Sequence, residues 1–150
     1  MALIQSPWAL GQKPVARPQT AHNTHSQLFI VDVPAAGFAL DDILELAVLH
    51  PYAQIIDAAI VPVGSLGAAT VDIGLMSGET GELLNANGTA RTVGAELFTG
   101  AAITAMLRLS KVDALLIPAT EKPRSIGVKF SAAVAAGAGK KIGLMLHFAQ

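Results

Sequence analysis

The sequence predicts an all-β fold, a jelly-roll or related β-sandwich domain, with an extended N-terminal arm. Apolar residues alternate with polar or small residues in several segments, and clusters of glycine and proline separate these segments. Three further prolines concentrate near the N-terminus. The length of 150 residues is that of one domain. We therefore expect an arm over residues 1–26 and one β-sandwich domain over residues 27–150.

The arm contains Pro7, Pro14 and Pro18 among glutamine, asparagine, threonine and histidine residues. Prolines at this density disfavour both helices and strand pairing. A segment of this kind is either disordered or lies on a neighbouring molecule. Its one tryptophan and its two basic residues are the candidate contacts to such a partner: Trp8, Lys13 and Arg17.

Strands are predicted where the alternation is clear. In Ser125–Phe130 the residues Ile126, Val128 and Phe130 share one face, and Lys141–Phe148 repeats the pattern with four inward apolar residues. Short punctuated strands favour a sandwich over a doubly wound α/β sheet. Five further apolar runs bring the expected number to about seven strands: Leu28–Val33, Ile43–Leu49, Gln54–Val63, Thr70–Met76 and Ala114–Ile117.

Two features fit the strand pattern less simply. The alanine-rich segment Thr92–Leu109 is predicted to form a helical turn followed by a strand. Glycine occupies an outward position in three predicted strands, at Gly74, Gly127 and Gly143. Such glycines indicate either a smooth sheet face offered to a partner or to the second sheet, or merely permissive positions.

The composition points to an assembly. Charged residues make up 14% of the chain, against about 25% in an average soluble domain. Such a chain either hides part of its surface against other proteins or is a weakly charged, alanine-rich monomer. The net charge of −1 and the scattered basic residues argue against direct nucleic-acid binding. No apolar run is long enough for a membrane span, and no export signal is recognisable.

Residues that could support catalysis are not grouped. The chain has no cysteine, and the pair His22 and His25 lies in the arm without a nearby acidic residue. Gly64–Gly67 lacks the pattern of a serine nucleophile elbow. Glu45 and Asp72 fall at polar positions of alternating strands, where we expect contact with solvent or an interface. We therefore predict no enzyme activity, no catalytic residues, no metal and no cofactor.

Three stretches carry a resemblance: Ala69–Gly78, Ala90–Gly100 and Pro123–Phe130. In this order they resemble the small head cement (decoration) proteins of tailed bacteriophages, and the likeness runs roughly from Leu28 to Ala149. The resemblance implies a jelly-roll or β-sandwich on the outer surface of the capsid of a virion, made in the host cytoplasm. It further implies binding to the major capsid protein, often as a homo-oligomer (dimer or trimer).

The function implied by this resemblance is structural. Each copy would bridge neighbouring major capsid subunits and so stabilise the expanded shell, and the arm residues Trp8, Lys13 and Arg17 would contact the capsid or a neighbouring subunit. The alternative is a carbohydrate- or receptor-binding module of a phage particle with the same β-sandwich fold. Aromatic residues make up only 5% of the chain, which argues against the aromatic platforms of sugar sites.

Overall fold

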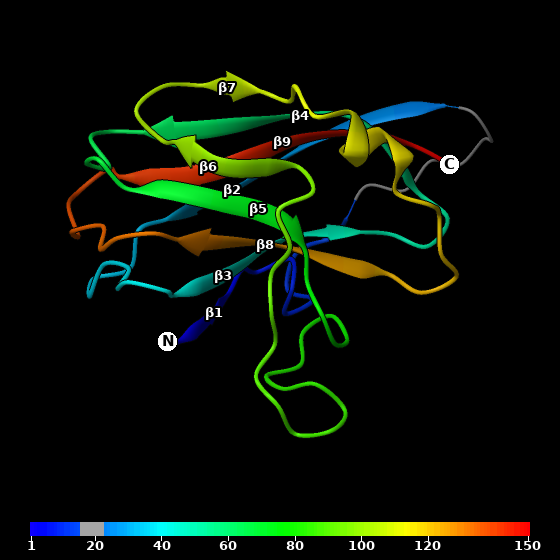
Figure 1. The fold of residues 1–150 in the computed structure, drawn as a ribbon, viewed down its shortest axis with the longest axis horizontal. Helices are drawn as coiled ribbons and strands as arrows, with labels where there is room; N and C mark the ends of the chain where they lie inside the picture. The colour runs from blue at the N-terminus through cyan, green and yellow to red at the C-terminus, as the bar shows by residue number, and fades with distance from the viewer. Residues whose placement is uncertain (16–22) are drawn as a thin grey trace.

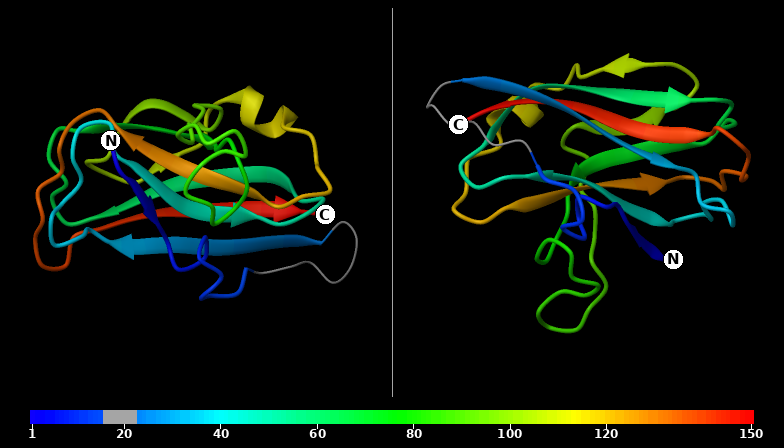
Figure 2. Two further views of the ribbon diagram at one scale, coloured as in Figure 1. Left: turned by 90° about the horizontal axis from the view of Figure 1, so that it is seen from below. Right: turned by 180° about the vertical axis from the view of Figure 1, so that it is seen from behind.

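The computed structural model describes residues 1–15 and 23–150 and shows two β-sheets packed face to face. The predicted all-β sandwich is therefore confirmed, and Figures 1 and 2 show its two layers. The five-stranded sheet contains, in spatial order, β1 (Leu3–Gln5), β3 (Ile43–Leu49), β8 (Arg124–Phe130), β5 (Thr70–Leu75) and β6 (Phe98–Ala102). The four-stranded sheet contains β2 (Thr24–Asp32), β9 (Lys141–Ala149), β4 (Gln54–Val63) and β7 (Leu107–Arg108).

Neighbouring strands pair antiparallel, except that β1 runs parallel to β3. The longest ladder without a register shift joins β2 to β9 over Thr24–Asp32 and Lys141–Ala149, and β4 pairs with the other edge of β9 over the same residues. A short 3₁₀ helix, η1 (Val112–Leu116), follows β7 and packs against β4. Because the chain passes repeatedly between the two sheets, residues far apart in sequence form the core.

The core lies between the sheets and consists of the side chains that the alternation placed inward. Ile126, Val128 and Phe130 of β8 are buried. The predicted inward residues of β9 are buried as well: Ile142, Leu144, Leu146 and Phe148. Phe38, from the loop before β3, stacks on Phe130 with ring centroids 4.2 Å apart. A two-residue period in the sequence was therefore enough to orient both strands.

Two local predictions were wrong in whole or in part. The run Ala114–Ile117 is not a strand, because Val112–Leu116 forms η1 and only Ala114 of that helix is buried. In Thr92–Leu109 the predicted strand is present as β6, followed by β7, but the predicted helical turn before it is absent. Both segments are short and apolar, and in such runs the sequence pattern alone does not separate strand from helix.

The N-terminal residues lie on the sandwich as far as Val15. Leu3–Gln5 form β1 beside β3, and Trp8 packs edge-on against Phe29 with ring centroids 5.1 Å apart. Trp8 is only 8% exposed, so its own chain already covers most of its side chain. The next strand of the described chain, β2, begins at Thr24, three residues before the start of the domain expected from sequence.

No helix of the described residues is both long and apolar enough to cross a membrane.

Candidate assembly surfaces

A long loop, residues 77–92, extends from the outer face of the five-stranded sheet, below the sandwich in Figure 1. The loop joins β5 to the segment that leads into β6. Its tip exposes two adjacent leucines, Leu83 and Leu84, with exposed fractions of 65% and 52%. Large apolar side chains at the end of a protruding loop are expensive to keep in water unless a partner covers them.

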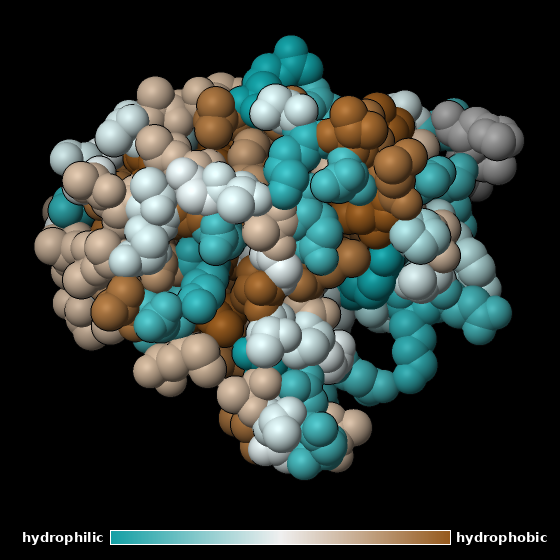
Figure 3. All heavy atoms as spheres, viewed as in Figure 1, coloured by the Kyte–Doolittle hydropathy of each residue, from teal (hydrophilic) through white to brown (hydrophobic). Residues whose placement is uncertain are grey.

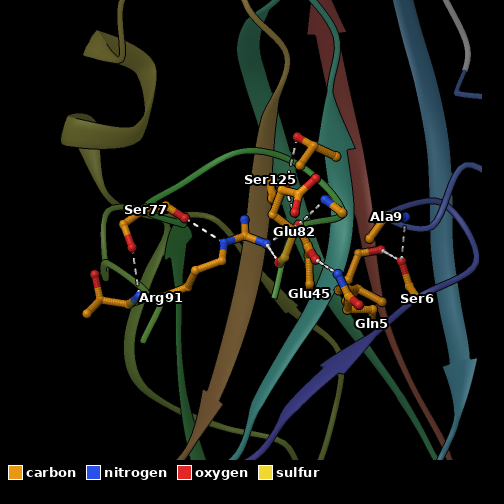
Figure 4. Close-up of polar contacts among 12 residues, drawn as sticks. Gln5, Ser6, Ala9, Glu45, Ser77, Glu82, Arg91 and Ser125 are labelled. Atoms are coloured by element: carbon orange, nitrogen blue, oxygen red, sulfur yellow. Dashed lines mark hydrogen bonds and ion pairs between the residues drawn. The ribbon is translucent and has the colours of Figure 1, made fainter. Parts of the chain in front are cut away.

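A buried ion pair holds the base of this loop to the sheet. Arg91 Nη1 donates to Glu45 Oε1 at 2.9 Å, and neither side chain is exposed to solvent. The Arg91 guanidinium also donates to the carbonyl oxygens of Ser77 (2.7 Å) and Glu82 (2.7 Å), both in the first half of the loop, and so ties that half to the second half, which contains Arg91. Figure 4 shows these contacts converging on the arginine.

Glu45 accepts hydrogen bonds from four parts of the chain. Besides Arg91, they come from Gln5 Nε2 in β1 (2.8 Å), the backbone N–H of Gly81 (3.2 Å) and Ser125 Oγ in β8 (2.5 Å). The expectation that Glu45 contacts solvent or an interface was therefore wrong. Loop residues that lie far away in sequence cover the Glu45 side chain on the outer face of the sheet.

The same covering explains two of the three outward glycines. Glu45, Gly127 and Gly74 lie in one row across β3, β8 and β5, because Glu45 pairs with Gly127 and Gly127 with Gly74. The segment after the loop crosses this row. A Cβ atom at Gly74 would lie 2.5 Å from the carbonyl carbon of Gly94, and one at Gly127 would lie 2.7 Å from Val93 Cγ2. Gly74 therefore permits a close approach by the protein's own backbone, and Gly127 makes room for the side chains of Met76 and Val93.

The tip of the loop has internal order of its own. The Asn85 N–H donates to the Thr89 carbonyl oxygen at 2.9 Å, and Asn85 Nδ2 donates to the carbonyl oxygen of Ala90 at 2.9 Å. Nearer the base of the loop, Lys122 Nζ donates to Glu79 Oε1 at 2.8 Å. This hydrogen bond lowers the pKa of Glu79 and raises the pKa of Lys122. The loop is thus held at its base, side and tip.

Between the loop and the end of β1 lies a concave surface of about 760 Å³, here called the tip cleft. Leu83, Leu84 and Ala86 supply its apolar lining, and two glutamates lie at it. Glu79 is the one paired with Lys122, whereas Glu82 forms no ion pair within the described residues. The complete lining is Gln5, Glu79, Gly81, Glu82, Leu83, Leu84, Asn85, Ala86 and Gly88.

A second apolar surface surrounds η1 and is here called the η1 patch: Ile56, Val112, Leu115 and Leu116. These side chains are 45%, 66%, 44% and 71% exposed. Figure 3 shows hydrophobic side chains gathered over η1, at the opposite end of the view from the loop tip. Beside the patch Arg108 bonds to Asp57, and this hydrogen bond lowers the pKa of the Asp57 carboxyl.

Of the three residues predicted as partner contacts, the structure brings two together. Trp8 is buried, and Lys13 Nζ lies 4.8 Å from the centre of the Trp8 ring. Arg17 lies outside the described residues. The loop tip and the η1 patch were not predicted, although their paired leucines at 83–84 and 115–116 are visible in the sequence.

The histidines are dispersed as well. His25 stacks on Phe148 at a centroid distance of 6.3 Å, His50 meets the same ring edge-on, and His147 Nδ1 lies 2.5 Å from Ser26 Oγ. The partner of His25 in the sequence pair, His22, lies outside the described residues. Within the described ranges no three histidine, aspartate or glutamate side chains are grouped as metal ligands would be.

The chain was compared with known proteins by sequence and by structure. No protein-family model and no curated protein matches it. Among solved structures, a chain in the capsid of the Ralstonia phage GP4 superposes with a TM-score of 0.83 and 36% identity, covering 99% of this chain and 98% of that one. A chain in the capsid asymmetric unit of cyanophage Pam1 shares the fold, with a TM-score of 0.56, 14% identity and coverages of 93% and 94%.

The likeness to the GP4 chain covers both surfaces described above, because it extends over almost the entire length of the two chains. Its identity is high enough to indicate common descent and not only a common sandwich architecture. The protein therefore belongs to the family of that GP4 chain and is a phage capsid-related structural protein of the virion.

Proposed function

We propose that this protein binds the outside of a phage head and cements neighbouring major capsid subunits, thereby stabilising the expanded shell. The full-length similarity to a chain of the GP4 capsid supports a place in the virion. The resemblance of three strand-and-turn stretches to head cement proteins supports the more specific role. Made in the host cytoplasm, the protein would occupy the outer capsid surface, where the major capsid protein is its partner.

The observation that carries this proposal is the presence of two separate apolar surfaces on one small domain. A protein that bridges two neighbours needs at least two contact areas, and exposed apolar patches are typical of such areas. In Figure 1 the loop that carries Leu83 and Leu84 projects below the sandwich, whereas η1 lies at its upper right. One copy can therefore contact two shell subunits, or one shell subunit and a second copy in a dimer or trimer.

The mechanism follows from mass action. A cement protein that fits only the expanded shell stabilises that state by about 2.7 kcal/mol per site when its free concentration is a hundred times the dissociation constant. Many sites on one shell add this effect. Rupture under internal pressure must then break cement contacts in addition to contacts between shell subunits.

The N-terminal segment supplies a third proposed contact. The Lys13 ammonium sits over the Trp8 ring, and Trp8 is fixed against Phe29. This arrangement holds a positive charge at the surface at a defined place, which suits a contact to an acidic group of a neighbour. We assign Lys13 and Arg17 to this contact and give Trp8 the role of supporting Lys13.

The aromatic residues give the carbohydrate-binding alternative less support. All five phenylalanines and Trp8 are buried, so Tyr52, with 52% of its side chain exposed, is the one aromatic platform available at the surface. Sugar sites commonly stack the pyranose ring on such platforms. A glycan array that showed saturable binding would favour this alternative over cementing.

The test is cosedimentation of the purified protein with expanded heads that lack it, followed by cryo-electron microscopy of the pellet. We expect saturable binding and ordered density at fixed positions between shell subunits. If the protein stays in the supernatant even at the highest concentration tested, the proposal is refuted. Unexpanded heads serve as the control, since a cement protein that recognises the expanded lattice binds them less.

A further inference from the structure

The tip cleft combines apolar side chains with a negative charge in a fixed shape. We propose that it binds an apolar segment of a shell subunit that carries a lysine or arginine. This inference rests on the proposed function and names the part of the molecule that contacts the shell.

The apolar part of the argument concerns the two leucines. Leu83 and Leu84 line the cleft while more than half of each side chain stays exposed. Because nothing in the described chain covers them, burial against a partner would release their hydration water. A leucine that becomes fully buried contributes about tenfold or more to affinity.

The electrostatic part of the argument concerns the two glutamates. Glu79 is neutralised by Lys122, whereas the Glu82 carboxylate forms no ion pair among the described residues; the Arg91 guanidinium contacts Glu82 only at its backbone carbonyl oxygen. The cleft therefore carries one uncompensated carboxylate beside its apolar lining. A basic side chain within an apolar segment complements this pattern, and an acidic one would be repelled.

Preorganisation makes this loop a better binding element than an ordinary surface loop. The Arg91 guanidinium joins both sides of the loop base, and Asn85 and Thr89 close its tip. Side chains that are already held in place lose little conformational freedom when the partner binds. The buried Glu45–Arg91 pair is costly to desolvate, and a rigid loop base is what the protein gains from it.

The experiment measures binding of purified variants to expanded heads lacking the protein. Leu83→Ser and Leu84→Ser are each expected to weaken binding about tenfold. The matched control is Leu40→Ser, because Leu40 is 59% exposed and lines a different concave surface. Glu82→Gln is expected to weaken binding about two- to fivefold at low salt and to have no effect at high salt. Its control is Glu121→Gln, an exposed glutamate outside the cleft.

Each outcome has a separate meaning. If wild-type protein binds the heads and all cleft variants bind equally well, this inference is wrong and the cementing function stands. If the leucine variants lose affinity but Glu82→Gln does not, the proposal that the partner segment carries a basic residue is wrong. If the leucine variants instead change self-association without heads, measured by ultracentrifugation, the occupant is a second copy. If wild-type protein itself does not bind, the proposed function fails, and this inference fails with it.

Discussion

At the scale of single residues, Arg91 has the largest structural role that the sequence left hidden. It forms the only ion pair of Glu45 within the described chain, and both side chains are fully buried. Its other hydrogen bonds join Ser77 and Glu82. An arginine in a polar loop gives no sign of burial in the sequence, because the partner glutamate lies 46 positions away.

Replacing Arg91 by methionine is expected to lower the free energy of unfolding by about 3–5 kcal/mol, because it leaves the Glu45 carboxylate buried without a counter-charge. Chemical denaturation followed by circular dichroism measures this loss. The control is Lys122→Met, which removes the exposed ion pair with Glu79 and is expected to change stability little. Equal losses in the two variants would contradict a stabilising role for the buried pair.

The glycine row gives a second prediction at this scale. Gly74→Ala is expected to cost about 1–3 kcal/mol, because its Cβ would lie against the rigid backbone of Gly94. Gly127→Ala is the matched comparison, since its Cβ would meet the side chains of Met76 and Val93, which are able to shift. We expect Gly74→Ala to unfold at a clearly lower denaturant concentration than Gly127→Ala; the reverse order would contradict this account of the crossing segment.

At the scale of elements, the strands that could be predicted from the sequence are those that are rich in apolar residues of their own. β3 and β4 have the predicted bounds, and β5, β8 and β9 differ from the prediction by one residue at one end. Each of these strands carries enough apolar residues to mark its own position. β1 was missed because three residues become a strand only through pairing with β3, a contact that the local sequence does not encode.

The N-terminal segment illustrates this dependence on tertiary contacts. Its prolines indicated an arm, yet β1 pairs with β3, and Trp8 covers Phe29 in the core. Deleting residues 1–9 removes both contacts and the hydrogen bond from Gln5 to Glu45. Loss of the buried tryptophan alone is expected to cost about 3–5 kcal/mol.

We therefore expect the protein without residues 1–9 to show a strongly lowered melting temperature in differential scanning calorimetry. Lys13→Ala is the control, because Lys13 is exposed and its removal leaves β1 and Trp8 in place. If the truncated protein melted at the same temperature as Lys13→Ala, the N-terminal segment would be a peripheral arm. Shell binding is best tested with Lys13→Ala, since the truncation changes stability as well.

At the scale of the whole molecule, the placement of the two apolar surfaces determines how strongly the protein can bind. A single weak contact gives an ordinary affinity, whereas two linked contacts raise the overall affinity by roughly 10²–10⁴ without strengthening either one. The sandwich provides the rigid connection, because its core packs the strands of the five-stranded sheet, which carries the long loop, against β4, and η1 packs against β4. The low content of charged residues is consistent with a surface that is partly covered in the capsid.

This geometry predicts a specific pattern in combined variants. Val112→Ser with Leu116→Ser removes much of the η1 patch, and Leu83→Ser with Leu84→Ser removes the loop contact. If both surfaces bind the shell at once, either double variant loses the linkage and weakens binding to expanded heads by roughly 10²–10⁴, and the quadruple variant does not bind measurably. If only one surface contacts the shell, one double variant binds like wild type, and the quadruple variant binds no more weakly than the other double variant. The second pattern, measured by cosedimentation with folded proteins of equal melting temperature, would show that the protein decorates the shell at a single contact and does not bridge its subunits.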